Sequence, residues 1–321
     1  MKTILVIVPL LLAGVQGFGW GFYGHKKVNY YAVFLLPPEM LVFYKANLLF
    51  VTEHAVDPDK RRYAVREEGP RHYIDLDQYG RYPYDSLPRE WTAAVEKYSE
   101  DSLNKHGIVP WWIQVMLGRL TAAFREKNGR KILKLSADLG HYVADAHVPL
   151  HASSNHNGQL TGQQGIHGFW ESRIPELLAE KEWSFFAERA SYLRQPLAFS
   201  WKRVLQSAGA ADTVLRFEKK LNDGFPPDAK YAFENRNGLI TRQYSSAYTL
   251  AYDRLLGGMV ERRFVESVQA VASMWYTAWV NAGQPDLREL TAAAATEIEK
   301  KEYEELNRKW REGEAQGKAC N

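Results

Sequence analysis

Apolar side chains recur at three- and four-residue steps along most of the chain, which places them on one face of an α-helix. The clearest case is residues 260–282, where Phe264, Val268, Val271, Trp275 and Trp279 share a face. The same spacing predicts helices over residues 91–103, 110–126, 131–146, 169–179, 183–190, 199–205, 211–220 and 242–256. We find no strand–helix alternation, glycine-rich nucleotide loop or internal repeat. The sequence therefore predicts an all-α protein, a multi-helix bundle.

Composition is that of an ordinary globular protein, with 45% hydrophobic and 25% charged residues among 321, enough to bury a substantial core. The net charge of +3 is too small to argue for nucleic acid or an anionic membrane as a partner, and it excludes neither. No linker-like stretch interrupts residues 20–289, so we expect one helical domain there, in a monomer. Residues 290–321 are rich in Ala, Glu and Lys and predict a charged, exposed C-terminal helix and tail.

The first nineteen residues differ from the rest. Lys2 supplies a positive start, residues 4–15 form an apolar run, and residues 17–19 offer small side chains for cleavage. This order is typical of a secretory signal peptide. The run of about a dozen residues is short for a membrane span of roughly 20. We expect a secreted or periplasmic protein with no transmembrane span after cleavage; the alternative is an uncleaved membrane anchor.

The chain has one cysteine, Cys320, so it cannot form an internal disulfide. The expected position of Cys320 on a mobile tail argues against a role as a ligand or nucleophile. Without a disulfide, the core or a bound metal must stabilise this fold in an oxidising compartment.

Two histidine–carboxylate pairs dominate the candidate chemistry. If residues 131–146 are helical, His141 and Asp145 are four residues apart on one face and can grip one ion. His151 follows after the helix has ended, and His167 with Glu171 repeats the same four-residue spacing. Nitrogen and oxygen donors in this combination suit zinc. A plain hydrogen bond explains one such pair, but two pairs around a third histidine favour a metal site.

Further candidates lie nearer the N-terminus. Residues 20–25 read WGFYGH and begin at the expected cleavage site with Trp20 and His25; Asp57 and His72 follow. In this order, and together with the two pairs above, these features resemble the zinc-dependent phospholipase C and S1/P1 nuclease superfamily. Every ligand position of that family has an occupant here, between Trp20 and Glu171.

The resemblance implies a helical bundle of that family's type and three zinc ions. The implied ligand sets are Asp57, His72, His141 and Asp145; then His151, His167 and Glu171; then the amine and carbonyl of Trp20 with His25, Asp145 bridging to the first set. An α-amine has a pKa near ~7.7–8.0, so it can bind zinc at neutral pH, but only once cleavage has created it.

The implied activity is hydrolysis of phosphate esters, with the ions activating water and neutralising developing charge. Asp57 is our candidate for orienting or deprotonating the attacking water; the alternative is a helix cap beside Pro58. Asp145 is the candidate bridging ligand, and the alternative is a partner of another ligand. The remaining histidines, His54, His106, His147 and His156, are expected to be surface or supporting residues.

Substrate contacts are less constrained. Asp75 corresponds to the position at which family nucleases meet a base, and a structural turn explains it equally well. Tyr73 is a stacking or core residue, and Asn155 is a phosphate contact or a turn residue. The WGFYGH opening and Asp75 favour a single-strand nuclease or 3′-nucleotidase, whereas Glu171 and the segment after His151 favour a phospholipase C. As a whole the chain resembles bacterial proteins of the zinc-dependent phospholipase C family. A secreted zinc-binding protein without catalysis is the alternative from another class.

Overall fold

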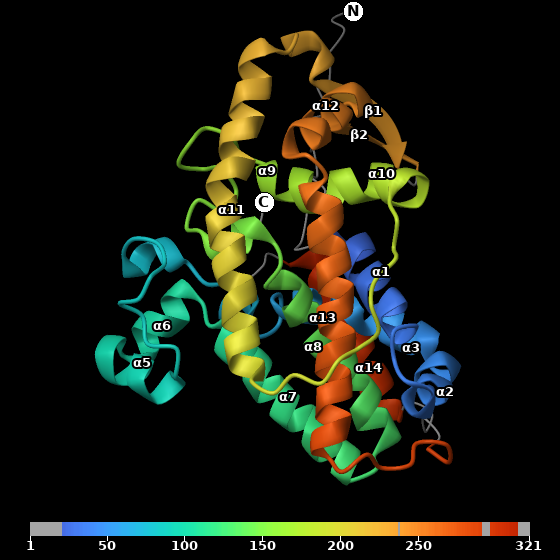
Figure 1. Ribbon diagram of the computed structural model, residues 1–321. Coiled ribbons are helices and arrows are strands. Elements are labelled where there is room, and N and C mark those ends of the chain that lie inside the picture. Colours follow the sequence, from blue (N-terminus) through green and yellow to red (C-terminus); the bar gives the residue numbers. More distant parts are fainter. Residues whose placement is uncertain (1–20, 237, 291–295, 314–321) are drawn as a thin grey trace, which may run out of the picture.

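The computed structural model describes residues 21–236, 238–290 and 296–313, and within them it is mostly helical (Figure 1), which confirms the all-α class. The helices are α1 (Gly21–Val33), α2 (Pro38–Ala46), α3 (Leu48–Glu53), α4 (Asp57–Arg61), α5 (Trp91–Tyr98), α6 (Glu100–His106), α7 (Val109–Arg125), α8 (Gly129–Asp145), α9 (Ile166–Gly168), α10 (Ile174–Glu182), α11 (Pro196–Gly224), α12 (Ser246–Leu256), α13 (Met259–Asn281) and α14 (Glu297–Glu312). Short 3₁₀ turns occupy His54–Val56, Arg66–His72, Leu76–Tyr79, Pro149–Ala152 and Pro227–Ala229, and a π-helical turn, Phe169–Arg173, joins α9 to α10. Residues 1–20, which include the expected signal peptide and Trp20, lie outside the described residues, as does Cys320.

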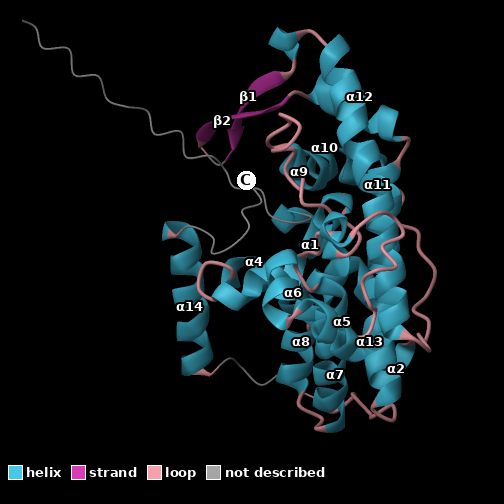
Figure 2. Cartoon of the chain, turned by 90° about the vertical axis from the view of Figure 1, so that its left-hand side faces the viewer, coloured by secondary structure: helices cyan, strands magenta, loops and turns pink. Residues whose placement is uncertain are grey.

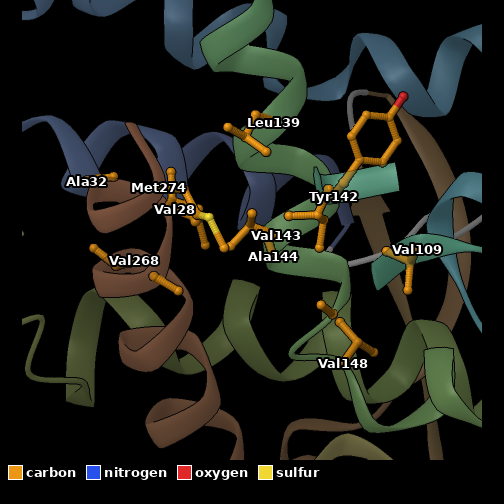
Figure 3. Close-up of a cluster of buried hydrophobic side chains, with 14 of the residues drawn as sticks. Val28, Ala32, Val109, Leu139, Tyr142, Val143, Ala144, Val148, Val268 and Met274 are labelled. Carbon is orange, nitrogen blue, oxygen red and sulfur yellow. The ribbon is translucent and has the colours of Figure 1, made fainter. Parts of the chain in front are cut away.

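Helix α8 lies at the centre of the fold and packs against α1, α7 and α13. Its first turn is capped by Asn128, whose side-chain oxygen accepts a hydrogen bond from the Lys131 amide at 3.0 Å. Val143 from α8, Val28 from α1 and Met274 from α13 are fully or almost fully buried and meet in the core (Figure 3). The helix that carries the first histidine–carboxylate pair is therefore held on several sides by apolar contacts.

Gly140 lets α1 approach α8 closely. A β-carbon at this position would lie 2.0 Å from Oδ1 of Asn29, on α1. Asn29 is fully buried, and its amide donates hydrogen bonds to the carbonyls of Val51 at 3.1 Å and Ala137 at 3.2 Å. Asn29 therefore ties α1 to α3 and to α8, beside the helix turn that bears His141.

We expect Gly140→Ala to lower the free energy of unfolding by about 1–3 kcal/mol, because the added methyl group overpacks this contact. Denaturant unfolding measures the effect. Gly118→Ala on α7 is the matched control, because a β-carbon there meets nothing within 4 Å; it should be neutral or stabilising by up to ~1 kcal/mol through helix propensity. Equal effects of the two substitutions would contradict the close-packing account.

A β-hairpin is the element that the helical spacing missed. Strands β1 (Tyr231–Arg236) and β2 (Leu239–Tyr244) pair antiparallel (Figure 2). The prediction of a helix from residue 242 is therefore wrong at its start, and α12 begins at Ser246. The signal was present in Asn237-Gly238, because Asn-Gly between two strand-like runs is the strongest short-range hairpin signature. Gly238 has φ +85°, as such a turn requires.

Four other helix predictions differ from the structure. Residues 183–190 form no helix: Trp183 and Phe185 alternate with exposed neighbours and pack on Phe264, at ring-centroid distances of 5.5 and 5.7 Å, which is the period of an extended chain. The two segments predicted within residues 199–220 belong to the single helix α11. Residues 91–103 divide into α5 and α6 at Ser99, which has φ +67°.

The C-terminal helix α14 lies on the surface, and none of its residues 297–312 is buried. It packs against α4 (Figure 2) and reaches toward the start of α1, where the ring of Trp310 lies 5.1 Å from that of Phe22. Tyr303 contacts His54 with ring centroids 4.6 Å apart. Among the described helices, none has the length and apolar content that a membrane crossing requires.

Candidate metal centre

Buried histidine and acidic side chains gather at three places between α1, α4, the 3₁₀ turn Arg66–His72, α8 and the segment 151–171. Each place holds three donor atoms that all lie within 4.8 Å of one another. The groups are His25, His141 and Asp145; Asp59, His72 and His141; and His151, His167 and Glu171. We call them the first, second and third groups. Such a density of buried ionisable side chains is costly unless the side chains are paired with one another or with a cation.

Asp145 connects the first two groups through its two oxygens. Its Oδ2 lies 3.0 Å from Nδ1 of His72 and 3.2 Å from Nε2 of His141. Its Oδ1 lies 3.3 Å from Nε2 of His25. Four ligands around a tetrahedral zinc are about 3.3 Å apart, given zinc–ligand distances of roughly 2.0–2.1 Å. The spacing of these donors therefore fits coordination, and each carboxylate oxygen faces a different set of nitrogens.

The second group contains Asp59 rather than the predicted Asp57. Oδ1 of Asp59 lies 3.8 Å from Nδ1 of His72 and 3.7 Å from Nε2 of His141, and neither Asp59 oxygen has a hydrogen-bond partner among the described residues. Asp57 instead lies 2.6 Å from Nδ1 of His54 and 3.7 Å from Lys60. Both aspartates belong to α4, where a two-residue step turns the side chain by about 200°, so only one of them faces the histidines.

The third group offers three donors. Nε2 of His167 lies 2.7 Å from Oε2 of Glu171 and 3.0 Å from Nε2 of His151, and Nε2 of His151 lies 3.6 Å from the same glutamate oxygen. His167 and Glu171 are four residues apart across α9 and the π-helical turn, which keeps both on one face. Three protein ligands leave a fourth tetrahedral position open, as in catalytic rather than structural zinc sites.

Backbone carbonyls orient two of the histidines. Nδ1 of His141 donates to the carbonyl of Ala55 at 2.9 Å, and Nδ1 of His151 donates to the carbonyl of His72 at 2.7 Å. A ring whose Nδ1 carries the proton presents the lone pair of Nε2 to its other side. Both Nε2 atoms face their groups, which is the orientation that metal binding would require.

Burial sets the charge state of the site. It lowers the pKa values of His25, His141 and His151, so these rings are neutral donors at neutral pH. Burial raises the pKa of Glu171 to about 8 and that of Asp59 to about 6. These carboxyl groups would ionise fully beside a cation. The free-energy cost of burying them without one is a physical reason to expect a bound cation here.

For His72 and Asp145, neighbouring charges outweigh burial and favour the ionised form of the side chain. Burial lowers the pKa of His72, but its interactions with Asp145 and Glu68 outweigh burial and raise it. Burial alone would raise the pKa of Asp145. The surrounding histidines, His141 first among them, outweigh burial and bring the pKa well below its usual value. Asp145 is therefore the anionic centre of the first two groups.

Beyond the proton that the Trp20 amine and any metal-bound water would release, metal loading at pH 7 should release about one to two protons per chain, because ligands must be deprotonated to bind. Glu171 and His72 supply them, since both pKa values are raised. Above about pH 9 Glu171 is already ionised, so the release should fall. Calorimetric titration in buffers of different ionisation enthalpy counts the protons. Glu171→Gln should remove part of the release, and a count that is constant from pH 6 to 9 would contradict this charge assignment.

The predicted substrate residues lie outside the three groups. Tyr73 is 8% exposed and donates a long hydrogen bond of 3.5 Å to the carbonyl of Lys105. Asp75 is buried, and its amide donates to the carbonyl of His106. The side-chain NH2 group of Asn155 donates a hydrogen bond to the hydroxyl of Thr161, and its side-chain oxygen accepts one from the backbone N–H of Leu160 at 2.8 Å. The last pattern is the turn chemistry that was one of the two predicted roles for Asn155.

Two histidines that were not predicted as ligands are more buried than expected. His147 is fully buried and donates from Nδ1 to the carbonyl of Val143 at 2.8 Å, so it is not a surface residue. His156 is 8% exposed, and its ring lies 6.0 Å from that of His167. Its position beside the third group was not evident from the loop in which it lies. Trp20 and the remaining residues before Gly21 are outside the described part of the chain.

The comparisons with known proteins give no assignment. No protein-family model matches the chain, and no curated protein matches it. The candidate function therefore depends on the residues and on their geometry.

Proposed function

We propose that this protein is a zinc-dependent phosphoesterase that hydrolyses phosphodiesters, of the phospholipase C and P1 nuclease type. The observation that carries the proposal is Asp145. Its two oxygens face two different sets of histidine nitrogens at 3.0–3.3 Å, as a bridging carboxylate would. The third group lies next to it, since Nδ1 of His151 is 3.7 Å from Oδ1 of Asp145. Adjacent metal positions of this kind serve in-line displacement at phosphorus.

The donor set supports zinc. All ligands in the three groups of described residues are imidazole or carboxylate, and none is a thiolate. When bound, the ions would supply a nucleophile at neutral pH and neutralise charge on the phosphate oxygens. His151, His167 and Glu171 would hold one ion with an open position for substrate. Asp59, beside His72, has two oxygens that find no hydrogen-bond partner in the described part of the chain. We propose that one of them orients the attacking water, the role that the sequence assigned to Asp57.

The start of α1 supports a third ion. His25 belongs to the first group, which has only three donors among the described residues. Gly21 lies one helix turn before His25, and a β-carbon on it would lie 2.4 Å from the hydroxyl of Ser172, which follows Glu171. The chain thus enters α1 beside the three groups. We propose that removal of residues 1–19 during export leaves the amine of Trp20 as a ligand there.

A phosphodiester of lipid is our preferred substrate, with single-stranded nucleic acid as the alternative. Binding of single strands needs exposed aromatic faces on which bases stack. Phe169, between His167 and Glu171, is 1% exposed and stacks on Tyr244 with ring centroids 3.8 Å apart. Phe169, an aromatic side chain beside these ligands, is therefore packed inside the protein and offers no stacking face, which supports a lipid substrate. A non-catalytic zinc-binding protein is less compatible with the open position of the third group.

The test uses purified chain starting at Trp20 with its metal content measured. Hydrolysis of a water-soluble phosphocholine diester, of phosphatidylcholine vesicles and of single-stranded DNA is then compared, with and without a chelator. We expect chelator-sensitive cleavage of both choline substrates. Chelator-sensitive cleavage of DNA alone would move the activity to the nuclease type. No cleavage of any phosphodiester by the zinc-loaded protein would refute the proposed function.

A further inference from the structure

The turn that joins the first two groups to the third is held from outside the metal centre. It comprises residues 146–148, between Asp145 at the end of α8 and the 3₁₀ turn that contains His151. The last carbonyls of a helix have no partner within it. Here the carbonyl of Ala146 accepts a hydrogen bond from the hydroxyl of Ser207 at 2.7 Å, and the carbonyl of His147 accepts one from Nε of Arg263 at 2.8 Å.

Arg263 is a buried arginine whose hydrogen bonds fix its guanidinium at this contact. It is 7% exposed on α13, and its guanidinium also donates to the hydroxyl of Ser207 and to the carbonyl of Arg203 at 3.3 Å. Its nearest carboxylate, on Glu266, accepts a hydrogen bond at 3.4 Å and is only partly buried. Burying a guanidinium is costly unless hydrogen bonds compensate. Four acceptors, the Glu266 carboxylate among them, surround this guanidinium, so the side chain is fixed in direction as well as in place.

The position of the turn decides the distance between ligands. Nδ1 of His151 lies 3.7 Å from Oδ1 of Asp145, so the groups on either side of the turn adjoin each other. Metal ligands must keep their distances within about 0.2 Å. A small movement of the Ala146 and His147 carbonyls would shift His151 against Asp145 by more than that tolerance. The contacts of Ser207 and Arg263 oppose such a movement.

We infer that Arg263 and Ser207 are positioning residues that set the spacing between Asp145 and His151, an inference that rests on the proposed metal centre. Neither residue contacts a metal ligand's side chain in the described structure. They belong to α13 and α11, both of which follow the last candidate ligand in the chain. The C-terminal half of the protein thus takes part in building the metal centre, although it supplies none of the three groups.

Competition with a chromogenic chelator tests the inference through metal affinity, which does not depend on turnover. Ser207→Ala removes one hydroxyl, and Arg263→Met removes the guanidinium while keeping much of its volume. We expect each variant to bind its most weakly held ion about 10- to 100-fold more weakly, the usual effect of losing a partner that orients ligands. The visible spectrum of the cobalt-substituted protein should change as well. Arg263→Lys should not restore binding, because an ammonium cannot make the same divergent contacts.

Two controls separate positioning from plain stability. Arg262→Met removes the neighbouring exposed arginine and should leave metal affinity unchanged. Val268→Ala truncates a buried residue of α13 and should lower stability without changing the cobalt spectrum. If Arg263→Met fails to fold, Ser207→Ala decides.

Normal metal affinity in folded Ser207→Ala, or equal loss in Val268→Ala, would overturn the inference. A parent protein that binds metal but cleaves no phosphodiester would instead refute the proposed function. In that case the affinity measurements still test the positioning role.

Discussion

Asp145→Asn should abolish hydrolysis and remove the metal from the first two groups. The side chain is fully buried and lies within 3.3 Å of nitrogens of His25, His72 and His141. The substitution keeps the shape of the side chain but removes its negative charge. An NH2 group, which cannot bind a cation, replaces one of the two carboxylate oxygens. We expect activity to fall by about 10³-fold or more, as when a single electrostatic contact to the reacting centre is lost.

The matched control is Asp138→Asn on the same helix. Asp138 is also buried, but it pairs with Arg61 at 2.9 Å and belongs to none of the three groups. The substitution Asp138→Asn should lower the stability of the protein and leave the number of bound metal ions unchanged. Elemental analysis of both variants, after circular dichroism has confirmed folding, gives the answer. An Asp145→Asn protein that retains its metal and activity would exclude the bridging role.

Asp59→Asn should impair the protein far more than Asp57→Asn. Asp59 is 1% exposed and faces His72 and His141, and its carboxylate has no hydrogen-bond partner among residues 21–236, 238–290 and 296–313 that substitution would remove. We expect about a 10²- to 10³-fold loss of activity, because this side chain is both a candidate ligand and the candidate for orienting water. Asp57→Asn should cost less than about tenfold, since Asp57 pairs with His54 and Lys60 at the edge of α4.

The two aspartates serve as each other's controls, because they lie two residues apart on one short helix. Steady-state rates and metal content of both variants decide between them. The reverse order of effects would return the catalytic assignment to Asp57, as the family resemblance implied. Equal and small effects would mean that neither carboxylate belongs to the metal centre.

The sequence predicted those features of the site that follow from helix geometry alone. The pairs His141 with Asp145 and His167 with Glu171 depend only on the four-residue spacing, and in the structure both pairs meet, at 3.2 and 2.7 Å. The choice between Asp57 and Asp59 depends on which face of a one-turn helix meets α8. That is a matter of tertiary packing, which a pattern of residue types does not contain.

Other features were hidden for related reasons. The hairpin that begins at Tyr231 was not predicted, although Asn237-Gly238 marked its turn, and only its last residues, 242–244, were assigned to a helix. The contact of Arg263 with the carbonyl of His147 joins residues 116 positions apart. An arginine on an apolar helix face gives no sign in the sequence of the backbone atom that it will meet. Its burial could be found only in the folded protein.

Two neutral histidine rings are in contact where the chain enters α1. His25 stacks on His141 with ring centroids 3.8 Å apart, and burial lowers the pKa values of both. Two neutral rings in contact can bind cations on either side, whereas two charged rings would repel each other. The close packing permitted by Gly140 therefore matters for the metal centre as well as for the stability of the fold.

The most direct test of the central claim is a crystal structure of the chain beginning at Trp20, with anomalous data collected on both sides of the zinc absorption edge. We predict zinc peaks at all three places: between His72, His141 and the two aspartates Asp59 and Asp145; between His151, His167 and Glu171; and beside His25. No zinc peak at any of the three groups in a zinc-loaded crystal would contradict the account.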